Sequence, residues 1–306
     1  MEPIIHPVFE PSTGTWQYVV ACPSTRAAAI IDPVLDFDLA SATITTRSAD
    51  SLLALIKEHN YTVTYLLETH AHADHLTAAA YLQEKLVASG QPRPPICIGA
   101  RIRTVQETAA QKYDIPESEL AQAFDRLLAD DDQLPLGNYS ITLFHLPGHT
   151  PDHVGYRLQD NVFTGDSIFN PDVGSARCDF TGGDARALFN SMKTLLNLPS
   201  HVRLYTGHDY PPAPATEADA KRPPLAYVTV ADQKARNKHA KDGSAEEDFV
   251  QWRADRDSGL NEPRLLHPAL QVNVRGGRMP VGMEVAMTPG GDKVGLRWGW
   301  EVPDRD

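Results

Sequence analysis

The sequence predicts an α/β fold in which helices cover the faces of β-sheets. Short apolar runs rich in β-branched residues alternate with longer segments that carry apolar residues at helical spacing. Several of the apolar runs end in a turn that contains histidine or aspartate. Because an α/β sheet gathers its ligands at strand ends, these turns predict one polar site at an edge of the sheets.

The first part of the chain predicts strands that lead through one helix to a histidine-rich turn. Apolar and β-branched residues predict the strands, and Ser48 can cap a helix that carries Leu52, Leu55 and Ile56 on one face. In order, we expect strands at 16–21 and 27–31, a Thr-rich loop at 36–47, the helix after Ser48, a strand at 63–67 and an Ala- and Leu-rich helix at 76–88.

The middle of the chain repeats this alternation, and the composition changes after residue 210. Proline-rich stretches and charged helical runs then predict an extension that packs on the core. The whole chain, 1–306, is predicted to form a single domain with the core at 1–210 and the extension at 211–306. We expect strands at 96–98, 139–146, 154–158, 161–166 and 202–205, two helices within 100–128, a helix capped by Asp184, and charged helices at 231–240 and 246–256.

The segment 69–75, with the sequence THAHADH, lies where a predicted strand passes into a predicted helix. His70 and His72 are two residues apart on an extended segment, so their imidazoles point to the same side. Asp74 and His75 lie at the start of the helix and point elsewhere. This arrangement predicts two neighbouring metal positions, and the alternative is a polar loop with solvated histidines.

Further histidines and an aspartate follow apolar runs later in the chain. His149 lies in the sequence PGHT, Asp166 in TGD and His208 in GHDY. His145 and His153 are weaker candidates, which we expect to be structural. Imidazole with carboxylate suits Zn, Fe or Mn and argues against thiolate chemistry. The complete set suffices for two metals, or for one metal with the remaining groups around it.

Charge and composition exclude several classes of protein. Asp and Glu number 40 against 28 Lys and Arg, so the net charge of −12 argues against nucleic acid or an anionic membrane as the main partner. No apolar run approaches the ~18 residues of a membrane span, and the N-terminus does not resemble a signal peptide. Cys22, Cys97 and Cys178 are far apart and odd in number, which favours a reducing, cytoplasmic setting.

The motifs HAHADH, PGHT, TGD and GHDY resemble those of the metallo-β-lactamase superfamily, in the same order and with similar spacing. The resemblance implies a metallo-β-lactamase-like αββα sandwich of two mixed β-sheets with helices on the outer faces. After Asp166, the sequence SARCDF resembles the GRxDF-type segment of the bacterial persulfide dioxygenase branch, with Arg177 and Asp179 retained. The segments at 246–250 and 270–276 also resemble that branch.

The resemblance to this branch implies an iron-dependent sulfur dioxygenase, which oxidises glutathione persulfide with O₂ to sulfite and glutathione in sulfide catabolism. The implied ligands of one Fe(II) per chain are His70, His149 and Asp166. His72, Asp74, His75 and His208 would then either surround that iron without binding it or form a second metal site. A facial triad of two histidines and one carboxylate leaves open positions for O₂ and for a persulfide sulfur.

Two other functions remain open from the sequence. A binuclear zinc hydrolase of glyoxalase II type, with two Zn per chain, would cleave a glutathione thioester with a metal-bound hydroxide and would use the complete ligand set. The residues after Asp166 and the C-terminal part of the chain argue against it. The third hypothesis is a non-catalytic sulfur-binding protein, and the intact ligand set argues against this hypothesis.

Glutathione carries two carboxylates, so its site needs local cations in this acidic chain. Arg177 lies close in sequence to the TGD motif, and its guanidinium can either grip a substrate carboxylate or pair with Asp179. Tyr210 can donate a hydrogen bond to the substrate, and Arg275 is a weaker candidate. Cys178 can exchange with a persulfide, although packing is the expected role of a free cysteine. The sequence does not decide which metal is bound, which thiol carries the persulfide, whether the protein forms a homodimer, or what the tail after Arg275 does.

Overall fold

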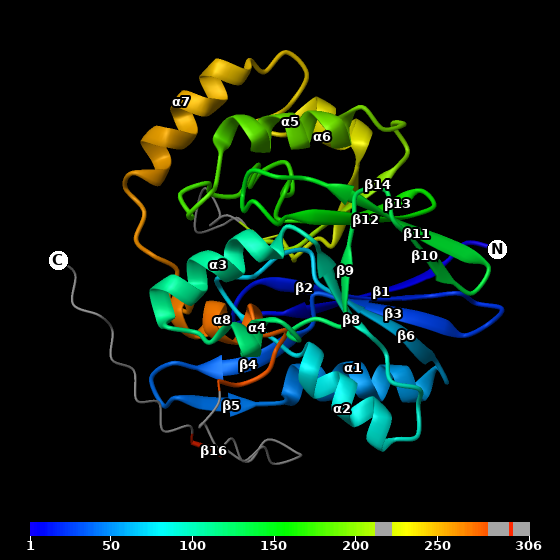
Figure 1. Ribbon diagram of the computed structural model, residues 1–306. Coiled ribbons are helices and arrows are strands. Elements are labelled where there is room, and N and C mark those ends of the chain that lie inside the picture. Colours follow the sequence, from blue (N-terminus) through cyan, green and yellow to red (C-terminus); the bar gives the residue numbers. More distant parts are fainter. Residues whose placement is uncertain (212–221, 281–293, 296–306) are drawn as a thin grey trace.

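Two β-sheets pack face to face and helices cover both outer faces (Figure 1), which confirms the predicted αββα sandwich. The structure is a computed structural model that describes residues 1–211, 222–280 and 294–295. Much of the tail after Arg275 lies outside these residues. Among the described residues, no helix is both long and apolar enough to cross a membrane.

The first sheet carries the histidine-rich segment at the end of one of its inner strands. In spatial order its strands are β1 (Ile4–Glu10), β2 (Thr15–Ala21), β3 (Ala27–Ile31), β6 (Thr62–Leu67), β8 (Ile96–Gly99) and β9 (Arg126–Leu128). Strands β1 to β3 pair antiparallel, whereas β3, β6, β8 and β9 run parallel. The segment 69–75 follows β6 and therefore leaves the sheet at the carboxyl edge of these parallel strands.

The second sheet is antiparallel except for one parallel pair. In spatial order its strands are β10 (Gln133–Leu136), β11 (Tyr139–His145), β12 (Val154–Leu158), β13 (Asn161–Gly165), β14 (Arg203–Thr206) and β15 (Tyr227–Thr229). The parallel pair is β13 and β14. Asp166 and His208 follow these two strands, so both residues leave the sheet at the same edge.

Apolar side chains fill the space between the sheets. Tyr18 and Leu67 of the first sheet lie in one buried cluster with Tyr156 and Phe163 of the second. Burying each such side chain stabilises the fold by about 1.5–3 kcal/mol, so the packed layers hold the strand ends in fixed positions. The outer faces are covered by α1 (Arg47–Glu58) and α2 (Ala79–Ala88) on the first sheet and by α5 (Ala185–Leu196) and α6 (Val230–Arg236) on the second.

The predicted loop at 36–47 is wrong, because this region pairs as strands. β4 (Val34–Asp38) pairs antiparallel with β5 (Thr43–Thr45) and, on its other side, with β7 (Leu76–Thr77). Threonine is a common strand residue, so the Thr-rich composition fits a strand as well as a loop. The pairing of β7 also makes the next helix start later than the predicted residue 76.

The prediction of two helices within 100–128 is confirmed only for the first, α3 (Ile102–Tyr113). The second is reduced to the short α4 (Glu117–Leu120), because residues 126–128 pair with β8 as a strand.

Two predicted caps have different outcomes. Asp184 caps α5 and accepts a hydrogen bond from the backbone of Ala187, whereas Ser48 bonds Asp36 and lies inside its helix.

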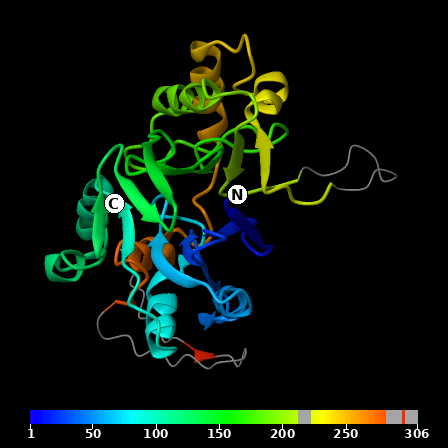
Figure 2. The same cartoon turned by 90° about the vertical axis from the view of Figure 1, so that its right-hand side faces the viewer.

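The residues after position 221 reach both layers of the sandwich. In both views the orange segment runs from α7 (Glu246–Asp257), beside α5, to α8 (Leu266–Asn273), near the first sheet (Figures 1 and 2). Phe189 of α5 packs on Phe249 of α7, with ring centroids 5.4 Å apart. The assignment of the whole chain to one domain, with a boundary at residue 210, stays a prediction.

Candidate metal centre

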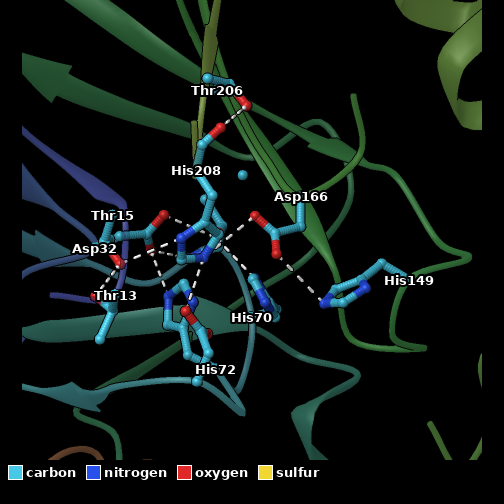
Figure 3. A network of polar contacts seen from close by, with 12 residues as sticks. Thr13, Thr15, Asp32, His70, His72, His149, Asp166, Thr206 and His208 are labelled. Atoms are coloured by element: carbon cyan, nitrogen blue, oxygen red, sulfur yellow. Dashed lines mark hydrogen bonds and ion pairs between the residues drawn. The ribbon is translucent and has the colours of Figure 1, made fainter. Parts of the chain in front are cut away.

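The candidate ligands converge from four loops at the edge of the sandwich. His70, His72, Asp74 and His75 follow β6, and His149 lies on the loop between β11 and β12. Asp166 follows β13 and His208 follows β14 (Figure 3). The edge of the sheets therefore brings together residues that are far apart in the sequence, as the strand-end argument predicts.

The first group of ligands consists of His70, His149 and Asp166. One ligand atom from each lies within 4.8 Å of the others, and all three side chains are buried. His149 Nε2 lies 3.5 Å from Asp166 Oδ2. Burial and the neighbouring imidazoles lower the pKa of His70 well below its ordinary value, so His70 carries the neutral imidazole that a metal requires.

The second group consists of His72, Asp74, His75 and His208, again with ligand atoms within 4.8 Å of one another. His208 Nε2 lies 3.2 Å from Asp74 Oδ2 and 3.6 Å from Asp166 Oδ1. Figure 3 shows Asp166 between His149 and His208. The two oxygens of Asp166 therefore face one group each.

The polar atoms of this centre fit a bound cation. Several of them are buried and make no hydrogen bond within the described part of the chain, namely His70 Nε2, His72 Nδ1, Asp74 Oδ2, both ring nitrogens of His75, Asp166 Oδ1 and His208 Nε2. A buried polar atom without a partner costs about 1–3 kcal/mol. So many of them at one place, on imidazoles and carboxylates, are explained by metal ligation.

For three of the histidines, His149, His208 and His70, a contact at Nδ1 turns Nε2 toward the centre. His149 Nδ1 donates to the carbonyl oxygen of Arg177 over 2.7 Å. His208 Nδ1 lies 3.2 Å from Thr15 Oγ1, and His70 Nδ1 lies 3.0 Å from the hydroxyl of the preceding threonine. Such contacts fix the orientation of a ligating imidazole, and for His149 the carbonyl partner also fixes the tautomer.

His72 is held differently from the other histidines, because two buried carboxylates lie on it. Its Nε2 lies 3.1 Å from Asp32 Oδ1 and 3.6 Å from Glu68 Oε2. Burial raises the pKa of Glu68 to about 7. Burial opposes a charge on His72, but Asp32 and Glu68 outweigh it and raise the pKa of His72 well above its ordinary value. Only Nδ1 of His72 is therefore free to face the metal centre.

The two weaker histidine candidates have contacts of their own. His153 Nε2 accepts a hydrogen bond from the backbone of Asp166 over 2.9 Å, and its Nδ1 lies 3.1 Å from Ser167 Oγ. His145 Nε2 lies 3.4 Å from the carbonyl oxygen of Pro151. The structure therefore gives His153 a supporting position behind Asp166, and neither histidine belongs to a ligand group among the described residues.

A cavity of about 430 Å³ opens beside His149 and Asp166. Three of the cations that line it, Lys238, Arg253 and Arg256, come from the residues after position 221. Its remaining lining includes Arg177, Phe180, Tyr210 and Trp252. The protein is acidic overall, so this concentration of positive side chains at the metal centre favours an anionic ligand.

The predicted substrate residues lie at different distances from this cavity. Arg177 lines it, but its guanidinium pairs with Asp179 through two nitrogens. Tyr210 also lines it, and its ring stacks on His208 with centroids 5.6 Å apart. Arg275 does not line it: this side chain is buried, pairs with Glu119 and bonds the backbone elsewhere, so we do not retain Arg275 as a substrate residue.

The cysteine beside the site is shielded from the reaction. Cys178 is 9% exposed, and burial raises the pKa of its thiol far above the ordinary value. A thiol without access to the thiolate form is a poor partner for exchange. These observations favour the packing role that we expected for Cys178.

Several residues of the site could not be found from the sequence. Asp32 and Glu68 directly follow β3 and β6, and this position after a strand was the one available signal for them. Lys238, Arg256 and Trp252 lie in charged helical runs where most side chains are solvated, and nothing in the local sequence separates them from their neighbours.

Comparisons with known proteins identify the family. A family model described as the metallo-beta-lactamase superfamily matches residues 13–208. A "Beta-lactamase hydrolase-like protein" of Xylella fastidiosa is 42% identical over 91% of this chain, which spans 62% of that relative's length. "Glyoxylase B2" of Dictyostelium discoideum is 38% identical, and the match covers 90% of this chain and 91% of the length of that relative.

Persulfide dioxygenases are among the relatives. The mitochondrial persulfide dioxygenase ETHE1 of Homo sapiens is 30% identical over 68% of each chain. The crystal structure of ETHE1 from Myxococcus xanthus matches with a TM-score of 0.69 at 26% identity, over 90% of this chain and 100% of that one. These matches support the predicted persulfide dioxygenase branch, and the family model covers both groups of ligands. The chain therefore belongs to the metallo-β-lactamase superfamily and carries its metal-binding histidines and aspartates.

Proposed function

We propose that the protein is a persulfide dioxygenase that holds one Fe(II) at His70, His149 and Asp166. The observation that carries the proposal is the cavity lined with cations, which opens directly beside His149 and Asp166. Glutathione persulfide carries two carboxylates, so its binding there would pair the substrate with the positive side chains. The reaction consumes glutathione persulfide, O₂ and water and yields glutathione and sulfite, with the terminal sulfur oxidised by O₂.

The ligand set of the first group suits this chemistry. Two histidines and one carboxylate form a facial triad, and a ferrous ion bound there would offer open positions to O₂ and to a persulfide sulfur. The protein's own contribution is orientation. The Arg177 carbonyl turns His149 toward the centre, and His153 holds the backbone of Asp166.

The cations of the cavity divide into paired and unpaired groups. Arg177 pairs with Asp179, and Arg253 pairs with Asp257. Lys238 and Arg256 make no salt bridge to any residue that the structure describes. These two cations are therefore the candidates for binding the carboxylates of glutathione through charge-assisted hydrogen bonds.

Binding by these cations would also orient the substrate. Carboxylates held at Lys238 and Arg256 would leave the persulfide end of the tripeptide free to approach His149 and Asp166. Tyr210, on the same wall and stacked on His208, can donate a hydrogen bond to the substrate. Holding both reactants at one place makes their encounter effectively unimolecular.

A second function is favoured by the completeness of the second ligand group. Asp74, His75 and His208 lie within ligand distance of one another, and Asp166 faces both groups. Two metals bound in this way would support hydrolysis of a glutathione thioester by a metal-bound hydroxide, as in the glyoxalase II reading. The name of the Dictyostelium relative points in the same direction.

One experiment separates the two functions on a single sample. Protein loaded with iron under anaerobic conditions is supplied with glutathione persulfide in an oxygen electrode, and the same protein is given a glutathione thioester. We expect O₂ uptake only in the presence of the persulfide, sulfite formed in step with it, and slow thioester hydrolysis. Zinc-loaded protein is the control, since zinc has no redox chemistry. Rapid thioester hydrolysis without persulfide-dependent O₂ uptake would establish the hydrolase instead.

A further inference from the structure

The short segment 176–178 links the metal centre to α7. The carbonyl oxygen of Arg177 accepts the hydrogen bond of His149 Nδ1 over 2.7 Å. The peptide groups on either side of Arg177 are held from α7. Arg253 Nη1 donates to the carbonyl oxygen of Ala176 over 2.9 Å, and the backbone nitrogen of Cys178 donates to Asp257 Oδ2 over 2.9 Å.

The two side chains that hold this segment form one buried ion pair. Arg253 and Asp257 lie one turn apart on α7 and are 4% and 8% exposed. A second nitrogen of Arg253 donates to the second oxygen of Asp257, so the pair grips the segment at two points while each charge neutralises the other. Well-packed apolar residues can replace a buried ion pair at little cost in stability, so burial of this pair is weak evidence for a stabilising role.

From these contacts we infer that the Arg253–Asp257 ion pair positions the metal ligand His149 by fixing the carbonyl oxygen of Arg177. With that oxygen in place, the proton of His149 stays on Nδ1, and the lone pair of Nε2 points toward Asp166, 3.5 Å away. Without it, the ring can rotate and change tautomer. Loss of a group that orients a ligating histidine in this way typically lowers metal affinity by about 10–100-fold.

Two features assign the pair a positioning role rather than contact with the substrate. The terminal nitrogens of Arg253 bond Ala176 and Asp257, so they are occupied although the residue lines the cavity. The side chain of Arg177 bonds Asp179 and the carbonyl oxygen of Asn261, so it fixes its own backbone only indirectly. The inference uses the metal centre alone and holds for both the iron dioxygenase and the zinc hydrolase, since both use His149.

The test measures metal affinity in a variant that removes the pair but keeps the packing. Arg253→Met combined with Asp257→Leu replaces both charges by apolar groups of similar volume. Apo protein is titrated with Co(II) against a chelator, the visible spectrum of the Co(II) form is recorded, and thermal unfolding of the apo protein is followed separately. We expect metal binding about tenfold or more weaker, an altered Co(II) spectrum, and an apo unfolding temperature close to that of the parent.

The control is Arg236→Met, which breaks an exposed pair of the same spacing with Asp232 on α6 and should leave affinity and spectrum unchanged. If the double variant does not fold, Asp257→Asn is used instead, because it keeps the shape of the side chain and weakens its contacts with Arg253 and with the backbone of Cys178. We expect this variant to lose metal affinity several-fold. Parent-like affinity and spectrum in whichever variant folds would overturn the inference and leave the pair a purely structural element. Because the readout is metal binding, failure here is distinct from failure of the dioxygenase proposal.

Discussion

The sandwich and the residues after position 221 contribute different parts of the site. Within the described residues, the sandwich supplies every candidate metal ligand, from the ends of β6, β13 and β14 and from the loop before β12. The later residues supply Lys238 and Arg256, the two cavity cations without a salt bridge in the described part of the chain, and contacts that support the metal loops. Under the proposed function, the sandwich would bind the metal and the later residues would bind the carboxylates of the substrate.

The two regions also differ in how their functional residues are held. The ligands lie on loops anchored by paired strands, whereas Lys238 lies in the turn after α6 and Arg256 lies on α7. Asn273 of α8 contacts one of these loops: its amide donates to the carbonyl oxygens of His72 and His75 over 2.8 Å each. Variants in each region should therefore change different measurable quantities.

The largest effect is expected within the sandwich, between the two ligand groups. His70→Ala removes one of three ligands from the first group and should abolish iron binding. His208→Ala leaves that group intact and should keep most of the bound iron. Metal content per chain after anaerobic loading measures both, with unfolding temperatures as the control for folding. Equal loss of metal in the two variants would mean that the groups bind as one two-metal unit.

The next effect concerns the support that α8 gives to the histidine loop. Asn273→Leu removes the two donors to the loop carbonyls and the acceptor for the backbone nitrogen of Thr77, all of which are buried. Leaving such groups unpaired should lower the free energy of unfolding by about 3–5 kcal/mol. Chemical denaturation of the apo protein checks this, and a loss below about 1 kcal/mol would show that water replaces the amide.

A smaller effect is expected from the cations of the cavity. Lys238→Gln combined with Arg256→Gln should raise KM for glutathione persulfide about tenfold and change kcat little, because two charge-assisted hydrogen bonds are weakened. Arg236→Gln, at an exposed residue already paired with Asp232, is the matched control. If kcat falls and KM does not change, the two cations do not bind the ground-state substrate.

Arg177 should show the smallest effect of the series. Arg177→Lys changes the side chain but keeps the carbonyl oxygen that accepts from His149. The guanidinium already pairs with Asp179, and partly exposed ion pairs contribute only ~0–1 kcal/mol, so KM should change by no more than a few-fold. Steady-state kinetics with the persulfide measures this. A tenfold rise in KM would instead support the direct contact with substrate, which is one of the two roles that the sequence left open for Arg177.

Those parts of the site whose residues are close together in the chain could be predicted from the sequence. The segment 69–75 could be recognised because its ligands lie within a few residues of one another and because the apolar run before it predicts a strand. Contacts such as Arg253 with Ala176, or Asn273 with His72, join residues far apart in the chain, and no periodicity marks them. The strands β4 and β5 were missed for a related reason, since they depend on pairing with each other and with β7.

The measurement that tests the account most directly is the number and position of metal ions in protein purified without oxygen. Elemental analysis gives the count, and anomalous scattering from crystals of the same sample gives the positions. We predict one iron per chain, in contact with His70, His149 and Asp166. Two fully occupied ions about 3.5–4 Å apart, with the second held by Asp74, His75 and His208, would contradict it and favour the two-metal hydrolase.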